Sequence, residues 1–190
     1  MKEKISVPEA MTVENGVFIK YCGDGEIVVV PEGVTEIAKC AFFRKAHLKE
    51  IVLPGTLEKI GEYAFYGAYG ISELVLPKSV YEIGEGAFMY CGFRSMTVPE
   101  GVKKIENGAF SYNRKLQRVV LPKGLLEIGE GAFRCCEKLA SVDIPESVTK
   151  FGAYAFSACD SLIKLEVPKG CETGREFYSS PKWGKGYKKK

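Results

Sequence analysis

The chain has 190 residues, of which 46% are hydrophobic and 27% are charged, proportions that are ordinary for a soluble globular protein. Its net charge of +3 comes from a C-terminal tail with five lysines, and the rest of the chain carries 22 basic and 24 acidic residues. That balance argues against a nucleic-acid partner, and the lack of 18 consecutive apolar residues argues against a membrane span.

Turn signals near the N-terminus predict a capping hairpin in residues 1–25. Asn15 and Gly16 precede a short apolar strand, and Gly23 to Gly25 follow it. Asn-Gly is a strong hairpin signal, because both residues tolerate a positive φ. Such a hairpin would cover the first open edge of the repeats that come next.

From residue 26 to residue 169 the sequence repeats with a period of 22 or 23 residues, which predicts a solenoid of six coils. The first marker of the repeat is a proline: Pro31, Pro54, Pro77, Pro99, Pro122, Pro145 and Pro168. The second is an Ala-Phe pair ten residues after each of the first six prolines, with the phenylalanines at Phe42, Phe65, Phe88, Phe110, Phe133 and Phe156.

Within each unit, positions are numbered here from its proline. Apolar residues at −3 and −1, such as Val119 and Leu121, have the period of two expected of a short strand with one buried face. A second apolar pair lies at +3 and +6, and the Ala-Phe pair is expected on one short helical turn that points inward. At +5 the charge alternates without exception: Glu36, Lys59, Glu82, Lys104, Glu127 and Lys150. Stacking in register would place each of these charges between opposite ones.

After Pro168 the pattern degenerates, which predicts a C-terminal cap and basic tail in residues 170–190. Gly174 replaces the apolar residue at +6, and no Ala-Phe pair follows. The aromatic residues Phe177, Tyr178, Trp183 and Tyr187 would fold over the last coil. Alternatively they would form an end-to-end dimer contact, since an uncovered solenoid end is an adhesive edge.

The unit seen from Leu116 to Cys136 resembles the BspA-like bacterial class of leucine-rich repeats, and the resemblance covers residues 26–169. It implies a leucine-rich-repeat solenoid, a right-handed superhelix of short parallel strands with short helical turns. It also implies an interaction protein, usually at the surface or secreted, that binds proteins or matrix without catalytic machinery. The class has no fixed functional motif, so the resemblance assigns no ligand residue.

Cysteine usage indicates a reduced protein without a metal cofactor. The seven cysteines are odd in number and lack Cys-x-x-Cys spacing, which fits neither a disulfide framework nor a zinc site. Cys136 and Cys159 would lie within disulfide range on adjacent coils, but buried thiols are the favoured interpretation.

Residues 1–9 lack the apolar core of a secretory signal. The chain as written is therefore expected in the cytoplasm, or at the surface or secreted if a leader has been removed.

Position −2 lies between two inward residues and is expected to face outward, forming a stripe for an unidentified protein or peptide partner. The alternative is that β-branched residues simply suit an exposed strand. The stripe consists of Val29, Val52, Val75, Thr97, Val120, Asp143 and Glu166, with Arg94, Arg118 and Lys164 beside it at −4 and −5.

A glycan-binding protein is the alternative function, with a purely structural role in assembly as a third. Tyr90 and Tyr112 share position +13 and would stack, and Asp143 and Glu166 would lie about 5 Å apart, the separation in retaining glycosidases. An open sheet offers no substrate cleft, however, and His47 is the only histidine. We therefore expect no enzyme activity, no metal and no cofactor.

Overall fold

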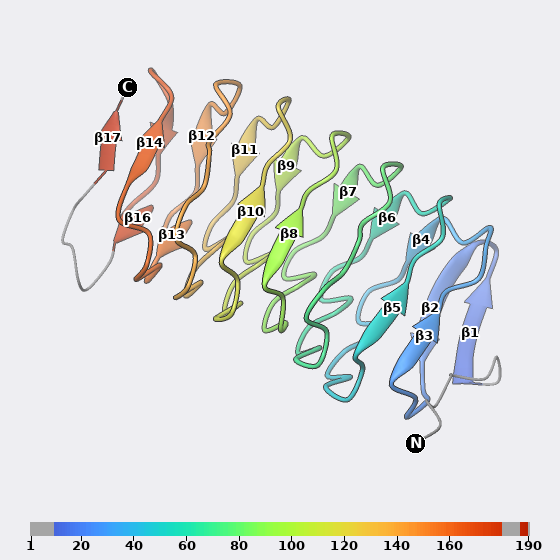
Figure 1. The fold of residues 1–190 in the computed structure, drawn as a ribbon. Coiled ribbons are helices and arrows are strands. Elements are labelled where there is room, and N and C mark those ends of the chain that lie inside the picture. Colours follow the sequence, from blue (N-terminus) through green and yellow to red (C-terminus); the bar gives the residue numbers. More distant parts are fainter. Residues whose placement is uncertain (1–9, 180–186, 190) are drawn as a thin grey trace.

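Short strands stacked coil upon coil form most of the regular structure of this chain (Figure 1). The computed structural model describes residues 10–179 and 187–189. Most coils contribute one strand to a front column and one to a rear column, and the coils follow one another along a single axis (Figure 1). In the described part of the chain, no helix is long and apolar enough to cross a membrane.

The front column contains the outward stripe of position −2. Its neighbours pair in parallel, with Val28 opposite Ile51 and Val119 opposite Met96. The middle residue of β5, β8 and β10 is buried and its two neighbours are exposed, as the period of two predicts. The strands of this column are β3 (Ile27–Val29), β5 (Glu50–Val52), β8 (Ser95–Thr97), β10 (Arg118–Val120), β14 (Leu165–Val167) and β17 (Tyr187–Lys189).

The front column is interrupted twice, where the repeat pattern predicts a strand and none forms. Residues 73–76 have no strand between β5 and β8, and residues 141–144 keep only an isolated bridge from Ser141 to Arg118. Figure 1 shows the first interruption as a coil without an arrow between β5 and β8. The sheet therefore divides into the separate pairs β3–β5, β8–β10 and β14–β17.

The rear column carries the alternating charges of position +5. Lys59 lies between Glu36 and Glu82 in the parallel register, and Glu127 lies between Lys104 and Lys150. The Lys59–Glu82 and Lys150–Glu127 ion pairs both measure 3.2 Å. The strands are β2 (Val17–Tyr21), β4 (Glu36–Ile37), β6 (Lys59–Ile60), β7 (Glu82–Ile83), β9 (Lys104–Ile105), β11 (Glu127–Ile128), β12 (Lys150–Phe151) and β15 (Glu172–Thr173). This column is also divided, because β7 and β9 belong to separate sheets.

Both ends of the solenoid are covered by strands outside this regular pattern. At the N-terminus β1 (Met11–Glu14) pairs antiparallel with β2 across a turn in which Asn15 and Gly16 have positive φ. At the C-terminus β13 (Phe156–Ser157) pairs with β16 (Tyr178–Ser179). Phe177 is buried and its ring lies 5.3 Å from that of Phe151, whereas Trp183 is outside the described residues.

The Ala-Phe segments form turns, so the expectation of a short helical turn in each coil needs correction. The N–H of Ala41 donates to Ala38 within its own coil, at 3.2 Å, but the N–H of Phe42 donates to Ala64 in the next coil, at 2.7 Å. Cys40 and Arg44, on either side of this pair, have φ of 57° and 56°. A left-handed residue stops a helix from continuing. Half of the donors therefore bond to the neighbouring coil.

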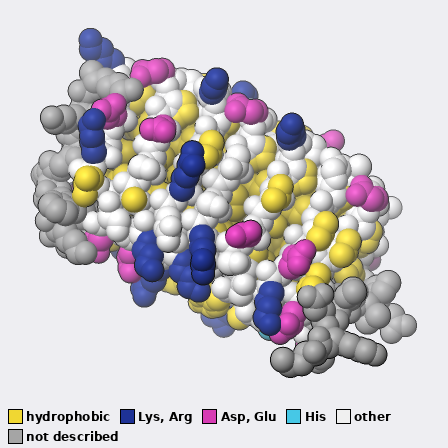
Figure 2. Space-filling view, in the orientation of Figure 1, with side chains coloured by type: hydrophobic (Ala, Val, Ile, Leu, Met, Phe, Trp, Pro, Cys, Tyr) yellow, Lys and Arg dark blue, Asp and Glu magenta, His cyan; other side chains and the backbone are white. Residues whose placement is uncertain are grey.

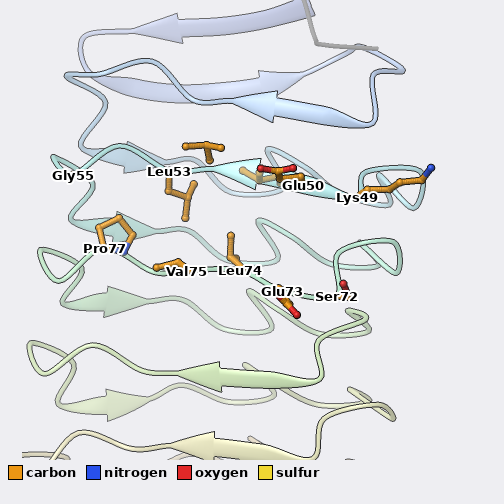
Figure 3. A pocket seen from close by; sticks show the side chains of 11 residues that line it. Lys49, Glu50, Leu53, Gly55, Ser72, Glu73, Leu74, Val75 and Pro77 are labelled. Atoms are coloured by element: carbon orange, nitrogen blue, oxygen red, sulfur yellow. The ribbon is translucent and has the colours of Figure 1, made fainter. Parts of the chain in front are cut away.

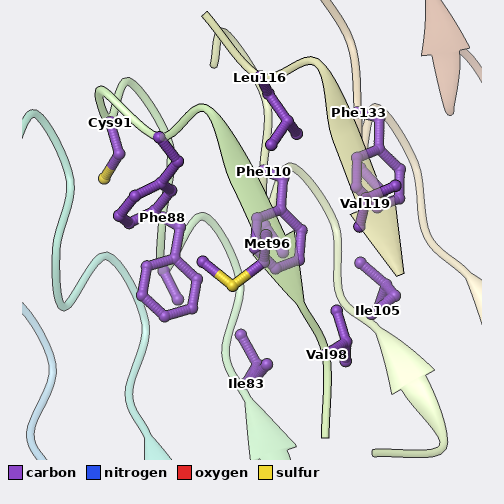
Figure 4. Close-up of a cluster of buried hydrophobic side chains, with 14 of the residues drawn as sticks. Ile83, Phe88, Cys91, Met96, Val98, Ile105, Phe110, Leu116, Val119 and Phe133 are labelled. Carbon is purple, nitrogen blue, oxygen red and sulfur yellow. The ribbon is translucent and has the colours of Figure 1, made fainter. Parts of the chain in front are cut away.

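A ladder of phenylalanine rings fills the centre of the solenoid. Consecutive rings from Phe18 to Phe156 are stacked, with centroids 4.8 to 5.4 Å apart. Phe18, from the capping hairpin, is the first ring of this ladder. Figure 4 shows Phe88, Phe110 and Phe133 in the midst of the inward side chains of the surrounding coils.

Phe110→Ala should lower the free energy of unfolding by about 3–5 kcal/mol, because it opens a cavity between two stacked rings. Phe43→Ala is the matched control, since Phe43 is 41% exposed and stacks on Tyr66 at the surface. Its loss should stay below about 1.5 kcal/mol. Urea unfolding measures both, and equal losses would contradict the central role of the ladder.

Gly108→Ala should cost about 1–2 kcal/mol through the backbone alone. Gly108 has a φ of 61°, and a Cβ added there meets nothing within 4 Å, so steric contact contributes nothing. Gly55 is equally open but lacks a positive φ, so Gly55→Ala should change stability by less than about 0.5 kcal/mol. Thermal unfolding of the two variants separates the conformational cost from the effect of adding a methyl group.

Candidate functional site

The outward stripe of the front column exposes apolar side chains on one face of the solenoid. Val29, Val52 and Val120 are 50%, 45% and 41% exposed, and Val75 reaches 85%. Thr97 is exposed as well. Figure 2 shows apolar side chains along this face, with charged side chains around them. This is an apolar surface without a covering element, which is typical of a contact surface.

The charged residues beside the stripe divide into paired and unpaired groups. Lys164 forms an ion pair with Glu166, and Lys49 forms one with Glu26 at 2.8 Å. Arg94 and Arg118 are exposed, and neither has an acidic partner among residues 10–179. These two guanidinium groups are therefore available to an incoming acidic group.

Two grooves border residues 73–76, the first interruption of the front column. One of about 790 Å³ separates this segment from β5, and it is lined by Glu50, Leu53 and Val75 among others (Figure 3). The other, of about 670 Å³, separates it from β8 and extends to Val120. Both volumes are in the range of ligand sites. Where the strand is missing, the surface is hollowed.

Asp143 and Glu166, the acidic end of the stripe, line a groove of about 420 Å³ beside the second interruption. Glu166 is held by Lys164, and Asp143 is exposed. No group of three potential metal ligands occurs among the described residues. The groove contains no tyrosine, so the structure does not join these carboxylates to the tyrosines in one glycan site.

The tyrosines form a separate cluster in the turns that precede the front column. The rings of Tyr90 and Tyr112 stack at 4.4 Å, and Tyr66 meets Tyr90 edge-on at 5.5 Å. Partial burial, with the neighbouring hydroxyls, raises the pKa of Tyr90. Tyr69 remains 54% exposed, and His47 is exposed as well. The stacked faces are used within the cluster and are not open to a sugar ring.

The buried cysteines three residues after the repeat phenylalanine have a structural role that the sequence pattern did not reveal. Cys91, Cys136 and Cys159 each donate their Sγ–H to the carbonyl of the phenylalanine in the preceding coil. The acceptors are, in the same order, Phe65, Phe110 and Phe133, at 3.1, 3.2 and 3.1 Å. None of the seven cysteines is in a disulfide. The sequence signal for this role was the shared offset of the three cysteines, each of which lies three residues after a repeat phenylalanine. That offset shows that these thiols belong to the repeat.

Stability should fall at alkaline pH because of these thiols. Burial raises the pKa of Cys159 to about 12 from an ordinary 9.0, and it also raises the pKa values of Cys91 and Cys136. The folded protein holds these protons more tightly than the unfolded chain. The stabilisation is therefore complete below pH 9.0 and decreases as the pH rises toward 12.

Urea unfolding across this pH range measures the effect. Cys159→Ser keeps a donor for Phe133 and removes the titration, so its free energy of unfolding should decline less steeply with pH. Cys22→Ser is the control, since Cys22 is exposed and its loss should leave the slope unchanged. Equal slopes for wild type and Cys159→Ser would show that the thiol does not contribute.

Comparison with known proteins adds to this geometry. The sequence profile of the BspA type leucine-rich repeat region matches residues 11–92 and 82–180, with six copies. No curated protein matches the chain.

Solved structures of bacterial leucine-rich repeat proteins share the fold. A leucine-rich repeat protein from Bacteroides ovatus is 28% identical with a TM-score of 0.68, covering 79% of this chain and 45% of that one. The T. pallidum leucine-rich repeat protein is 25% identical with a TM-score of 0.70, covering 84% and 91%. A leucine-rich cell surface protein from Faecalibacterium prausnitzii, 22% identical, has a TM-score of 0.72 and coverages of 93% and 66%. The chain thus spans less than half of the B. ovatus protein.

Proposed function

This chain belongs to the BspA-type leucine-rich repeat family, and from that premise we propose that it is a non-enzymatic scaffold that binds a protein or peptide partner. The binding surface is the outward stripe of the front column, together with Arg94, Arg118 and Lys164. We also propose the division into a capping hairpin (1–25), six repeats (26–169) and a C-terminal cap with a basic tail (170–190).

The observation that carries this proposal is the contrast between the two columns. On the rear column, charges meet opposite charges within each of two runs of paired strands, as at Lys59 and Glu82 and at Lys150 and Glu127, so much of that surface is self-neutralised. On the front column, valines remain exposed, and Arg94 and Arg118 lack an acidic partner among the described residues. Apolar contact area and unpaired guanidinium groups are enriched at protein interfaces.

A glycan ligand is less well supported. Carbohydrate recognition by aromatic residues needs an exposed ring face, but Tyr90 and Tyr112 stack on each other. The carboxylates of Asp143 and Glu166 line a groove in other coils. A glycan would therefore have to use exposed tyrosines such as Tyr69 and Tyr81, which lie outside the stacked pair.

The experiment compares two exposed apolar positions on different surfaces. Val120 on the front column is 41% exposed, and Leu126, between the two columns, is 49% exposed. A photo-reactive amino acid at each position, followed by cross-linking in an extract of the source cell, should give a discrete adduct at Val120 and none at Leu126.

The partner identified by its adduct should then bind Val120→Asp at least about tenfold more weakly than wild type, and Leu126→Asp within about twofold. Both variants should melt close to wild type, since neither side chain is buried. A partner attached equally at both positions, or insensitive to Val120→Asp, would contradict the proposed surface.

A further inference from the structure

Charged residues at position −4 of the front column are segregated by sign along the solenoid. In β5, β8 and β10 this position is the first exposed residue of the strand. Numbering the coils by their prolines, with Pro31 in the first, the second to fifth coils hold at this position Glu50, Glu73, Ser95 and Arg118. Arg94 precedes Ser95. Figure 2 shows acidic side chains near β5 and basic ones near β10 on this face. The face is therefore acidic toward the N-terminus and basic toward the C-terminus.

These charges are not neutralised within the chain. Glu50, Glu73, Arg94 and Arg118 are exposed, and none forms an ion pair with another described residue. Figure 3 shows Glu50 and Glu73 above one another on adjacent coils, with Lys49 pointing away from them. Each of the four has a charge of the same sign on an adjacent coil, which is unfavourable. Opposite charges that approach this face from outside would relieve both halves.

A two-fold rotation supplies those opposite charges. Let two copies meet front column to front column, with the rotation axis running along the strands between the third and fourth coils. The second coil of one copy then lies opposite the fifth coil of the other, and the third lies opposite the fourth. Rotation about this axis keeps the place of each residue along its strand. Glu50 therefore lies opposite Arg118, Glu73 lies beside Arg94, and each pair occurs twice.

The charges at position +1 fit the same rotation and limit its extent. Lys78 of the third coil and Glu100 of the fourth are exposed, and they would lie opposite each other. Lys78 forms no ion pair among the described residues, and Glu100 accepts a hydrogen bond from the backbone N–H of Lys123 at 3.3 Å. An axis through the fourth coil would instead oppose Lys78 to Lys123. One coil further out on each side, Glu32 would lie opposite Glu146, so the complementarity is confined to four coils.

The exposed valines would be covered by this contact. Val52 would lie opposite Val120, and these side chains are 45% and 41% exposed in the single chain. Val75, which is 85% exposed, would lie opposite Thr97, a residue that lines the groove of about 670 Å³. The projecting valine of each copy would thus meet the groove of the other. Apolar contact supplies the buried area of such an interface, and the charges fix its register.

We propose that the partner of the front column is a second copy of this chain, bound face to face in an antiparallel two-fold dimer in which Glu50 and Glu73 of each copy contact Arg118 and Arg94 of the other. This inference rests on the proposed function and names the partner. A two-fold interface must be self-complementary, and segregated charges on an otherwise apolar face meet that requirement.

Sedimentation equilibrium of the full chain tests the dimer. The weight-average mass should rise from 21.0 kDa toward twice that value between about 1 and 500 µM protein. Glu50→Arg and Arg118→Glu should each self-associate at least about tenfold more weakly, because each opposes like charges at two places in the symmetric dimer. Glu130→Arg is the matched control, since Glu130 is exposed outside the front column, and it should stay within about twofold of wild type.

An equimolar mixture of Glu50→Arg and Arg118→Glu distinguishes this dimer from an end-to-end one. In the mixed pair the native Glu50 of one variant meets the native Arg118 of the other, and the two introduced charges, which are opposite, also meet. The mixture should therefore dimerise within about threefold of wild type. A chain that stays monomeric at about 500 µM, species larger than a dimer, a dimer indifferent to both substitutions, or a mixture that fails to recover overturns the inference.

Photo-cross-linking at Val120 separates this inference from the proposed function. The purified chain alone should give an adduct of twice the chain mass. If the purified chain stays monomeric and the extract yields an adduct with a different protein, the dimer is overturned and the proposed function stands. Absence of any adduct at Val120, with the purified chain or in the extract, overturns both.

Discussion

The rise from one coil to the next is the constraint on which the rest of this structure depends. Adjacent strands share backbone hydrogen bonds only when they lie about 4.7–4.9 Å apart. The stacked phenylalanine rings, from Phe18 to Phe156, are separated by 4.8 to 5.4 Å. Because one rise satisfies both requirements, equivalent positions of successive units lie directly above one another. Each unit is too small to bury its own core, and the coils on either side of it complete that burial.

This stacking turns each position of the repeat into a column with its own chemistry. The position +5 column brings Lys59 between Glu36 and Glu82. Exposed pairs of this kind add little stability each, but like charges in the column would oppose the register. The position +14 column places thiols such as Cys136 under a phenylalanine carbonyl. The front column differs, because four of its outward residues at position −2, Val29, Val52, Val75 and Val120, are exposed apolar side chains.

The interruption at residues 73–76 is tolerated because other columns hold the same coil. The Phe65–Phe88 contact persists at 5.3 Å, and Lys59 remains opposite Glu82 on the rear column. The coil is therefore anchored at its centre and at its rear while its front ladder is open. Unpaired backbone groups at an exposed groove cost less than buried ones, since water reaches them. A repeat scaffold can thus lose one front ladder without losing its regular core.

The sequence by itself determined the period, the inward columns, the alternating charges and the hairpin turn at Asn15. These follow from translation along one axis, since the spacing of residues decides which of them share a column. Only the tertiary structure decided that Ser72 to Leu76 forms no strand although it keeps the repeat pattern, that the Ala-Phe pairs lie in turns, and that Asp143 lies apart from the tyrosines. A ladder hydrogen bond depends on the separation of two whole coils to within a fraction of an ångström. That separation is set jointly by the turns of adjacent units, and the repeat pattern of any one unit does not contain it.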